Sequence, residues 1–126
     1  MGKGIDRGPF YGDRRRYPRE AFDGPVNYRP LSGLPEEVVD GIGVDLSAGG
    51  LLFESSRSHL TGSAVSLVVT FPAWFGGGDA WAVGRVVRCE AVEGGASYKI
   101  AVEFTTISNS DRRRIEEFVQ SKALPY

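Results

Sequence analysis

Val65-Ser66-Leu67-Val68-Val69-Thr70-Phe71 is the stretch that indicates the fold most clearly, because every second residue in it is apolar. Such alternation places one set of side chains on a single face of a half-buried β-strand. Outward from this stretch, we predict further strands around residues 26–29, 36–46, 51–54, 81–89 and 98–104. Short, evenly spaced strands separated by turns favour an all-β fold, either a closed barrel or a sandwich.

Three local features refine this prediction. Gly41 and Gly43 interrupt one strand and indicate a bend or a bulge. Residues 72–79 are rich in glycine and predict a hairpin loop. The strand at residues 81–89 has apolar side chains on both faces, with Trp81 on one and Val86 on the other, so the pattern leaves open which face is buried.

The last predicted element is a single C-terminal helix. Ser108 or Ser110 can cap its first turn, and Asp111 suits the positive end of the helix dipole. One face of the helix then comprises Ile115, Phe118, Val119 and Lys122, at the spacing of an amphipathic helix. We expect this helix to plug or flank the β-structure.

Length and composition indicate one soluble domain. The chain has 126 residues, 41% of them hydrophobic, and a single cysteine, so no internal disulfide is expected. No stretch reaches the roughly 20 apolar residues that span a bilayer, and residues 1–10 lack the apolar region of a secretory signal. We therefore predict a cytoplasmic protein that does not insert into a membrane.

Residues 1–25 differ from the rest of the chain. They are rich in glycine, arginine, aspartate and proline without a clean period, which predicts a flexible N-terminal arm followed by a folded domain over residues 26–126. Residues 1–30 contain seven basic and four acidic side chains, whereas the net charge of the whole chain is -1. A local positive patch on a nearly neutral protein favours a small anionic ligand over a long nucleic acid.

Two segments carry ligand-binding chemistry. The first segment, Asp13-Arg14-Arg15-Arg16-Tyr17-Pro18-Arg19, offers several guanidinium groups. A guanidinium forms bidentate hydrogen bonds with phosphate oxygens or with the O6/N7 edge of guanine, and it can also stack on a purine. Asp45-Leu46-Ser47-Ala48-Gly49-Gly50 offers a carboxylate that can accept from guanine N1–H and N2–H, a hydroxyl, and glycines that permit positive φ and close approach. Taken singly, the segments have plainer interpretations, as a solvated basic tail and an ordinary Asx-type turn.

Together, in this order and ahead of a barrel of this length, the two segments resemble the PilZ family. That family is marked by RxxxR in an N-terminal loop and by [D/N]xSxxG after the second strand, and residues 15–19 and 45–50 match both motifs completely. The resemblance covers most of residues 13–121, including the segments at 50–53, 83–88, 100–104 and 110–114. Many members have glycine where this chain has Ala101, a departure that concerns strand packing and leaves both motifs intact.

The resemblance implies a six-stranded antiparallel β-barrel, with a flexible N-terminal arm and one C-terminal helix, that binds the bacterial second messenger cyclic di-GMP. Carried over by motif, Arg15 and Arg19 would contact phosphates and guanine edges. Asp45 and Ser47 would hold a guanine from the barrel surface, and Gly50 would shape the turn.

Arg14 precedes the motif, at a place where an arginine in the family often accompanies an intercalated dimer of the ligand. A third guanidinium could stack on a second nucleotide or neutralise it, so we expect such a dimer. The predicted function is that of a receptor and adaptor: the ligand orders the arm and alters a surface that meets an unidentified protein effector.

Other functions remain open at this point. A PilZ-like protein-interaction module that does not bind nucleotide is the main alternative, although such domains typically lack motif residues. A barrel that binds single-stranded nucleic acid is disfavoured by the near-neutral charge. Because no acid–base pair, nucleophile set, phosphate loop or metal-ligand cluster emerges, we predict no enzyme, no cofactor and no metal.

The remaining unusual residues have plain expected roles. We expect Cys89 to be a small buried hydrophobe and His59 to be exposed. Residues 112–114 are expected to form a solvated helix face that could extend the positive patch. Trp74 and Phe75 are expected to cover the barrel end, with a partner-binding tip as the alternative.

Overall fold

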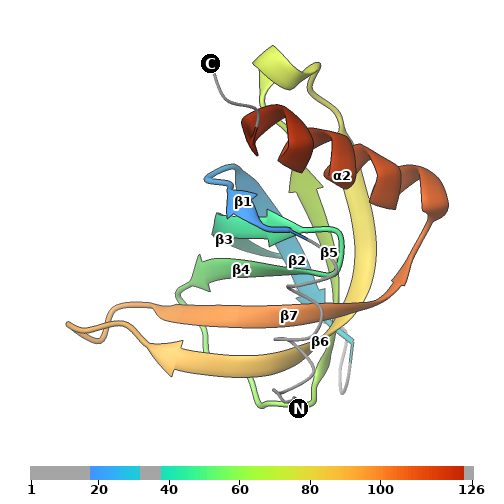
Figure 1. The fold of residues 1–126 in the computed structure, drawn as a ribbon. Coiled ribbons are helices and arrows are strands. Elements are labelled where there is room, and N and C mark those ends of the chain that lie inside the picture. Colours follow the sequence, from blue (N-terminus) through green and yellow to red (C-terminus); the bar gives the residue numbers. More distant parts are fainter. Residues whose placement is uncertain (1–17, 32–37, 124–126) are drawn as a thin grey trace, which may run out of the picture.

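Six antiparallel strands close into a barrel, and one helix lies across an end of it (Figure 1). The computed structural model describes residues 18–31 and 38–123. The described elements are β1 (Glu20–Ala21), β2 (Pro25–Pro30), β3 (Val39–Ser47), β4 (Gly50–Ser55), β5 (Ala64–Thr70), η2 (Ala73–Phe75), β6 (Asp79–Ala91), β7 (Tyr98–Ile107) and α2 (Asn109–Ala123).

The pairing of the strands decides between the barrel and the sandwich. The order β2-β5-β6-β7-β4 is closed by β3, which pairs with both β4 and β2. The first half of β3 pairs with β2, and the two-residue strand β1 pairs with its second half, on the edge that β2 leaves. The predicted six-stranded barrel is thus confirmed, with β1 as a short addition to it.

Alternating apolar side chains fill the barrel. In β5, Val65, Leu67 and Val69 are buried, as the alternation predicts, and the residues between them are half-buried. The largest fully buried side chains are Tyr28, Phe53, Phe118, Leu46, Leu51, Leu67, Ile100 and Ile115. Because they come from the helix as well as from several strands, the helix completes the core of the barrel.

In β6, the buried face is the one with the smaller side chains. The inward residues are Ala80, Ala82, Gly84 and Val86. A Cβ at residue 84 would stand 2.7 Å from the carbonyl oxygen of Glu103 on β7, so only glycine lets the two strands approach this closely. Trp81 lies outside, where its indole N–H donates to Ser66 Oγ at 2.9 Å. The half-buried Cys89 packs against the core, so its predicted burial is only partial.

β3 bends at its glycines, as predicted. Its register with β4 shifts between Gly43 and Asp45, which marks a β-bulge or irregularity. Gly41 and Gly43 both lie on the buried side of the strand. A shift of one residue reverses the face to which later side chains point. The bulge therefore helps to set where the motif residues beyond it lie.

α2 begins at a serine cap. Ser108 lies directly before the helix, and its Oγ accepts a hydrogen bond from the Asp111 N–H at 3.1 Å. Ser110, the other predicted cap, is already inside the helix. The Asp111 carboxylate in turn accepts from the backbone N–H of Trp81 at 3.1 Å, which ties the start of α2 to β6.

The predicted apolar face of α2 closes one end of the barrel. Its buried side chains are Ile115, Phe118 and Val119. Lys122, the polar end of that stripe, is exposed, but its Nζ donates to the carbonyl oxygen of Ala21 at 3.0 Å. The helix therefore contacts β1 as well as the barrel.

The chain joins the barrel earlier than the sequence predicts. The predicted arm runs to residue 25, but Glu20–Ala21 pair with β3 and Phe22 is only 2% exposed. The described part of that segment, residues 18–25, is therefore packed on the barrel. A single buried aromatic residue in a polar stretch has no periodicity, so the pattern could not reveal it. Residues 1–17, the rest of the predicted arm, lie outside the described residues.

A polar network involves β2, β4 and the loop after β4. Tyr28 Oη lies 2.6 Å from Ser55 Oγ and 2.7 Å from His59 Nε2. Burial, and secondarily the charge of Arg57, lowers the pKa of His59, while burial raises the pKa of Tyr28. The Nε2 atom of a neutral His59 can accept a hydrogen bond from the Tyr28 hydroxyl. His59 is thus half-buried and hydrogen-bonded rather than exposed as predicted, because its ring packs edge-on against Tyr28.

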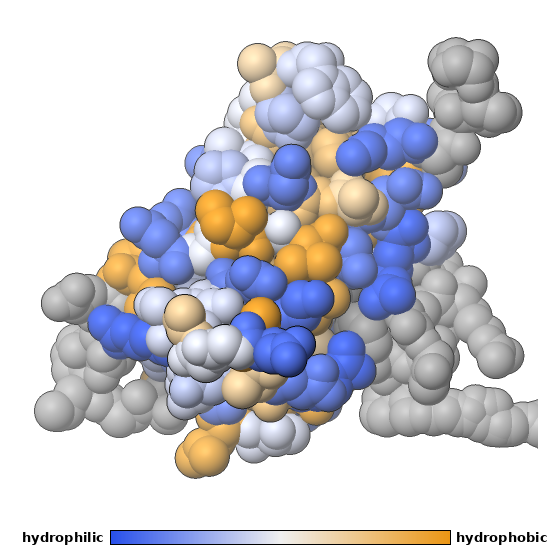
Figure 2. Space-filling view, turned by 90° about the vertical axis from the view of Figure 1, so that its left-hand side faces the viewer, coloured by the Kyte–Doolittle hydropathy of each residue, from blue (hydrophilic) through white to orange (hydrophobic). Residues whose placement is uncertain are grey.

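The outer surface is mixed in character. On the face in Figure 2, apolar side chains form separate islands between hydrophilic ones. Among the described residues, the exposed large apolar side chains are Leu31, Val38, Ile42, Leu60, Trp74 and Trp81. No helix in the described part of the chain combines the length and the apolar character needed to cross a membrane.

Candidate functional site

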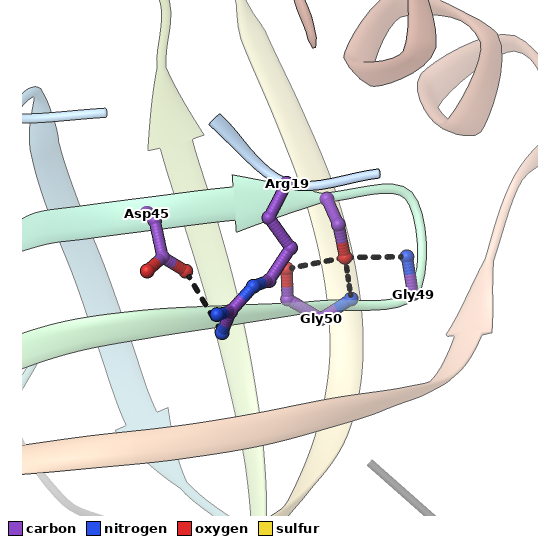
Figure 3. A network of polar contacts seen from close by, with 5 residues as sticks. Arg19, Asp45, Gly49 and Gly50 are labelled. Carbon is purple, nitrogen blue, oxygen red and sulfur yellow. Dashed lines mark hydrogen bonds and ion pairs between the residues drawn. The ribbon is translucent and has the colours of Figure 1, made fainter. Parts of the chain in front are cut away.

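The β3–β4 turn is held together by one serine hydroxyl. Ser47 Oγ accepts hydrogen bonds from the N–H groups of Gly49 and Gly50, each at 3.1 Å, and lies 3.4 Å from the Gly50 carbonyl oxygen (Figure 3). Ser47 is only 2% exposed, so these bonds form away from water. Its hydroxyl therefore accepts from two backbone donors inside a buried turn.

The glycines of this turn act differently from the prediction. Positive φ angles among the described glycines occur in other loops, at residues 62, 76–78, 94 and 95, and not at Gly49 or Gly50. The turn thus closes without a positive φ at either glycine. Both glycines are buried, and Gly50 pairs with Ser47 and with Glu103.

Arg19 and Asp45 form an ion pair above this turn. Arg19 Nη1 lies 3.5 Å from Asp45 Oδ1, with 28% and 22% of the two side chains exposed (Figure 3). Asp45 Oδ1 is buried yet has no hydrogen-bond partner among the described residues. A buried carboxylate oxygen normally accepts at least one hydrogen bond, so this atom has unused capacity for a donor.

β1 is what brings the arginine to the aspartate. In the β1–β3 ladder, Ala21 lies opposite Asp45 and Glu20 lies opposite Leu46. One further step in the same register sets Arg19 beside Ser47, next to the motif turn. Arg19 and Asp45 are 26 residues apart in the sequence, and the pairing of the two-residue strand β1 with β3 brings them together.

This pair presents complementary groups at one place. The guanidinium offers planar donors for phosphate or for the O6/N7 edge of guanine. The carboxylate offers acceptors for the N1–H and N2–H groups of guanine. Both side chains are half-buried, so a ligand that replaced their mutual contact would meet them in a partly desolvated setting, where such bonds are stronger than in water.

Two hollows lie in this region, and the smaller one is lined by the pair itself. The smaller, of about 250 Å³, is lined by Arg19, Glu20, Ala21, Val44 and Asp45. The larger, of about 500 Å³, lies between the motif turn and α2 and is lined by Pro18, Ala48, Arg113, Glu116, Glu117, Val119 and Gln120. Its volume is within the range of small-molecule sites, which is roughly 300–1,000 Å³.

The α2 residues of the larger hollow are the part of the region that sequence reasoning missed. From the sequence, residues 112–114 are expected to form a solvated helix face. Arg113 is exposed, but it lies across the hollow from the turn. The only sequence signal was the basic run itself, since its neighbours in space come from residues more than 60 positions away. No group of three or more His, Cys, Asp or Glu side chains suited to a metal occurs among the described residues.

The structure describes four of the six predicted ligand-binding residues. It brings Arg19 to Asp45, and it joins Ser47 to Gly50 in the turn directly beyond. Arg14 and Arg15 lie outside the described residues. Their predicted roles therefore stay predictions.

Comparison with known proteins agrees with this architecture. A family model described as PilZ domain matches residues 13–121. The Bacillus subtilis inhibitor of motility (MotI/DgrA) has a similar structure, with a TM-score of 0.76 and 20% identity, over 95% of this chain and 53% of that one. The PilZ domain with c-di-GMP of YcgR from Escherichia coli has a TM-score of 0.58 and 16% identity, over 86% of this chain and 90% of that one.

A third similar structure is the K. pneumonia MrkH–c-di-GMP complex, with a TM-score of 0.63 and 19% identity over 94% of this chain. The chain spans about half the length of the MotI/DgrA and MrkH chains that it matches. A search of curated proteins found no match. At these identities the likeness to solved structures shows the shared fold, whereas the family model covers both motifs and nearly all of the chain. The chain belongs to the PilZ domain family.

Proposed function

We propose that this chain is a receptor for cyclic di-GMP that acts as an adaptor rather than as an enzyme. The observation that carries the proposal is the Arg19–Asp45 pair beside the motif turn, with an Asp45 oxygen that has no hydrogen-bond partner among the described residues. Solved relatives of the same fold, the PilZ domain of YcgR and MrkH, are described with c-di-GMP.

Each motif residue has a distinct task in this proposal. Arg15 and Arg19 bind phosphates and guanine edges through their planar donors. Asp45 turns from Arg19 to the N1–H and N2–H groups of a guanine. Ser47 and Gly50 keep the turn in the shape that presents Asp45, because the Ser47 hydroxyl holds both glycine N–H groups.

Ligand binding has consequences beyond the pair. Arg14 supplies the charge and the stacking surface for a second, intercalated nucleotide. Residues 1–17 become ordered around the ligand, and the altered surface is what a protein effector binds. The alternative is a protein-interaction module with the same fold that meets its partner without binding nucleotide.

The test is calorimetric titration of the full chain with cyclic di-GMP, compared with the Asp45→Ala and Arg19→Ala variants. Each variant loses hydrogen bonds to a charged group, which corresponds to about 1.5–3 kcal/mol, or roughly ten- to a hundredfold in affinity. The matched control is Arg85→Ala, which removes a different ion pair, Arg85–Glu103 at 3.2 Å, from the barrel surface. This control should bind like the parent protein. No heat with folded parent protein at micromolar ligand would contradict the proposal.

A further inference from the structure

We propose that Phe22 is a positioning residue that couples the nucleotide site to α2 and to the exposed Trp74 at the tip of the β5–β6 loop. The ligand role of Arg19 and Asp45 rests on the proposed function, whereas the mechanical connection rests on contacts among the described residues. Phe22 lies three residues after Arg19 and is 2% exposed.

The first link joins the motif arginine to the Phe22 anchor. Ala21 lies opposite Asp45 in the β1–β3 ladder, and the Phe22 N–H donates to the carbonyl oxygen of Val44 at 3.1 Å. Arg19, Ala21 and Phe22 are thus successive parts of one short extended segment held against β3. If that segment moves, the guanidinium of Arg19 moves with respect to Asp45.

The second link is the slot that receives the Phe22 ring. A Cβ at Gly43 would stand 2.6 Å from the Phe22 carbonyl oxygen and nearer still to its ring. A Cβ at Gly24 would stand 2.7 Å from the end of the same ring. Contacts below 3 Å force one partner to shift, so both positions need glycine for the ring to occupy this place. The Phe22 ring therefore occupies one well-defined position.

The third link runs from Phe22 to the helix. The Phe22 ring meets Phe118 of α2 edge-on, with 5.6 Å between ring centroids, and meets Phe71 at 6.5 Å. One turn further along α2, Lys122 donates to the Ala21 carbonyl oxygen at 3.0 Å. The β1 segment is thus held to α2 by an aromatic contact and by a charge-assisted hydrogen bond.

The fourth link reaches the surface. Trp74 stacks on Phe118 with 5.8 Å between centroids and an angle of 30° between planes, yet 64% of Trp74 is exposed. Arg114 of α2 holds the same loop, since its guanidinium donates to the carbonyl oxygens of Phe75 and Gly77. The β5–β6 loop stands beside α2 at that end of the barrel (Figure 1).

These contacts form one continuous path of closely packed groups. Packed interiors resist small displacements and transmit them to their neighbours. A ligand that draws Arg19 away from Asp45 shifts the β1 segment, and Phe22 passes that shift to Phe118. Because Trp74 rests on Phe118, its environment reports the state of the nucleotide site. Phe22 also holds Arg19 in place before the ligand arrives, which lowers the ordering cost of binding.

The first experiment needs no ligand. Hydrogen exchange of the full chain is compared between Phe22→Leu and the control Phe53→Leu, which alters a core phenylalanine whose ring packs on Tyr28. We expect Phe22→Leu to speed exchange at residues 20–22 and at 118–122 by about tenfold or more. Phe53→Leu should leave both segments as in the parent protein. Equal effects of the two variants, or no effect of Phe22→Leu, would overturn the coupling.

The second experiment uses cyclic di-GMP and Trp74 fluorescence. Trp81→Phe leaves Trp74 as the only one of the chain's two tryptophans, and this parent should change its emission when ligand binds. Adding Phe22→Leu should weaken binding by about tenfold, which is about 1.4 kcal/mol, and should abolish the emission change at saturating ligand. Adding Phe53→Leu should preserve both. Lys122→Met, which removes the bond to Ala21 and the cation–π contact with Phe118, should reduce the emission change in part.

The outcomes separate this inference from the proposed function. Binding heat without any change in Trp74 emission would overturn the coupling and leave the receptor function intact. The absence of binding heat in the parent would overturn the receptor function, and the exchange experiment would then decide the positioning role of Phe22 alone. If Phe22→Leu fails to fold, Gly43→Ala displaces the ring and the backbone of Phe22 without altering that side chain and is judged by the same two measurements.

Discussion

At the scale of single residues, the motif region depends on groups whose roles differ although they are neighbours. Asp45 has an oxygen without a hydrogen-bond partner among the described residues, so it is available for a ligand. Ser47, two residues later, is fully engaged with the turn itself. In the proposed site, the motif thus combines one ligand-binding side chain with one structural side chain, a division that the sequence pattern alone does not reveal.

Replacing Ser47 by alanine should be costly in two ways. The change removes the Oγ that accepts from two buried N–H groups of the turn, which corresponds to about 1–3 kcal/mol of unfolding free energy. It should also weaken cyclic di-GMP binding, because the turn that presents Asp45 relaxes. Urea unfolding and calorimetric titration measure the two effects.

Ser63→Ala is the matched control for this change. The Ser63 hydroxyl donates to the Leu60 carbonyl oxygen at an exposed site, where water can replace it. Its removal should alter stability by no more than about 0.5 kcal/mol. If Ser47→Ala were as mild as Ser63→Ala, the structural role of the Ser47 hydroxyl would be wrong.

At the scale of elements, α2 contacts several parts of the fold besides the end of the barrel that it covers. Its start is tied to β6 through Asp111, its middle fills the core with Ile115 and Phe118, and its last turn is bonded to β1 through Lys122. Arg114 reaches from the same helix to the β5–β6 loop. We therefore expect any displacement of α2 to disturb the β5–β6 loop and β1 together.

The cap of α2 offers a test at this scale. Ser108→Ala removes the acceptor for the Asp111 N–H and should lower the unfolding free energy by about 1 kcal/mol. Ser110→Ala is the control, because Ser110 lies within the helix and alanine has the higher helix propensity. It should be neutral or slightly stabilising. Thermal unfolding of both variants distinguishes the cap, and equal losses in the two would show that Ser108 is not the cap.

At the scale of the whole molecule, the barrel contains a polar network in addition to its apolar core. This network involves β2, β4 and the loop that follows β4. The network places a half-buried imidazole against Tyr28, and burial lowers the pKa of His59. Because the pKa is lowered in the folded state, the His59 imidazole of the unfolded chain becomes protonated near pH 6.5, where the folded protein still keeps it neutral. This contribution to stability is complete above that pH and is lost as the pH falls toward the folded pKa.

We therefore expect the stability of the parent protein to fall between about pH 7.5 and pH 5. His59→Gln lacks the titrating group and keeps an acceptor for the Tyr28 hydroxyl, so its stability should change less over the same interval. Urea midpoints at a series of pH values provide the measurement. A parent protein with the same pH dependence as His59→Gln would show that His59 stays neutral in both states or gains its proton without cost.

The sequence by itself determined the strands, the helix and the motif turn of this protein. The alternation in β5, the glycines of β3 and the apolar stripe of α2 are local patterns, and local patterns follow from the two periods of regular structure. The same holds for the two motifs that indicated the family. These features needed no knowledge of which segments meet.

Only the tertiary structure decided what meets across the barrel. It buried Phe22 in a segment that the sequence assigns to the arm, selected the small-residue face of β6 and placed α2 beside the motif turn. It also brought Arg19 to Asp45 through two residues of strand pairing. The physical reason is that burial and ion pairing depend on neighbours far apart in the chain, and such neighbours are set by barrel closure rather than by local spacing.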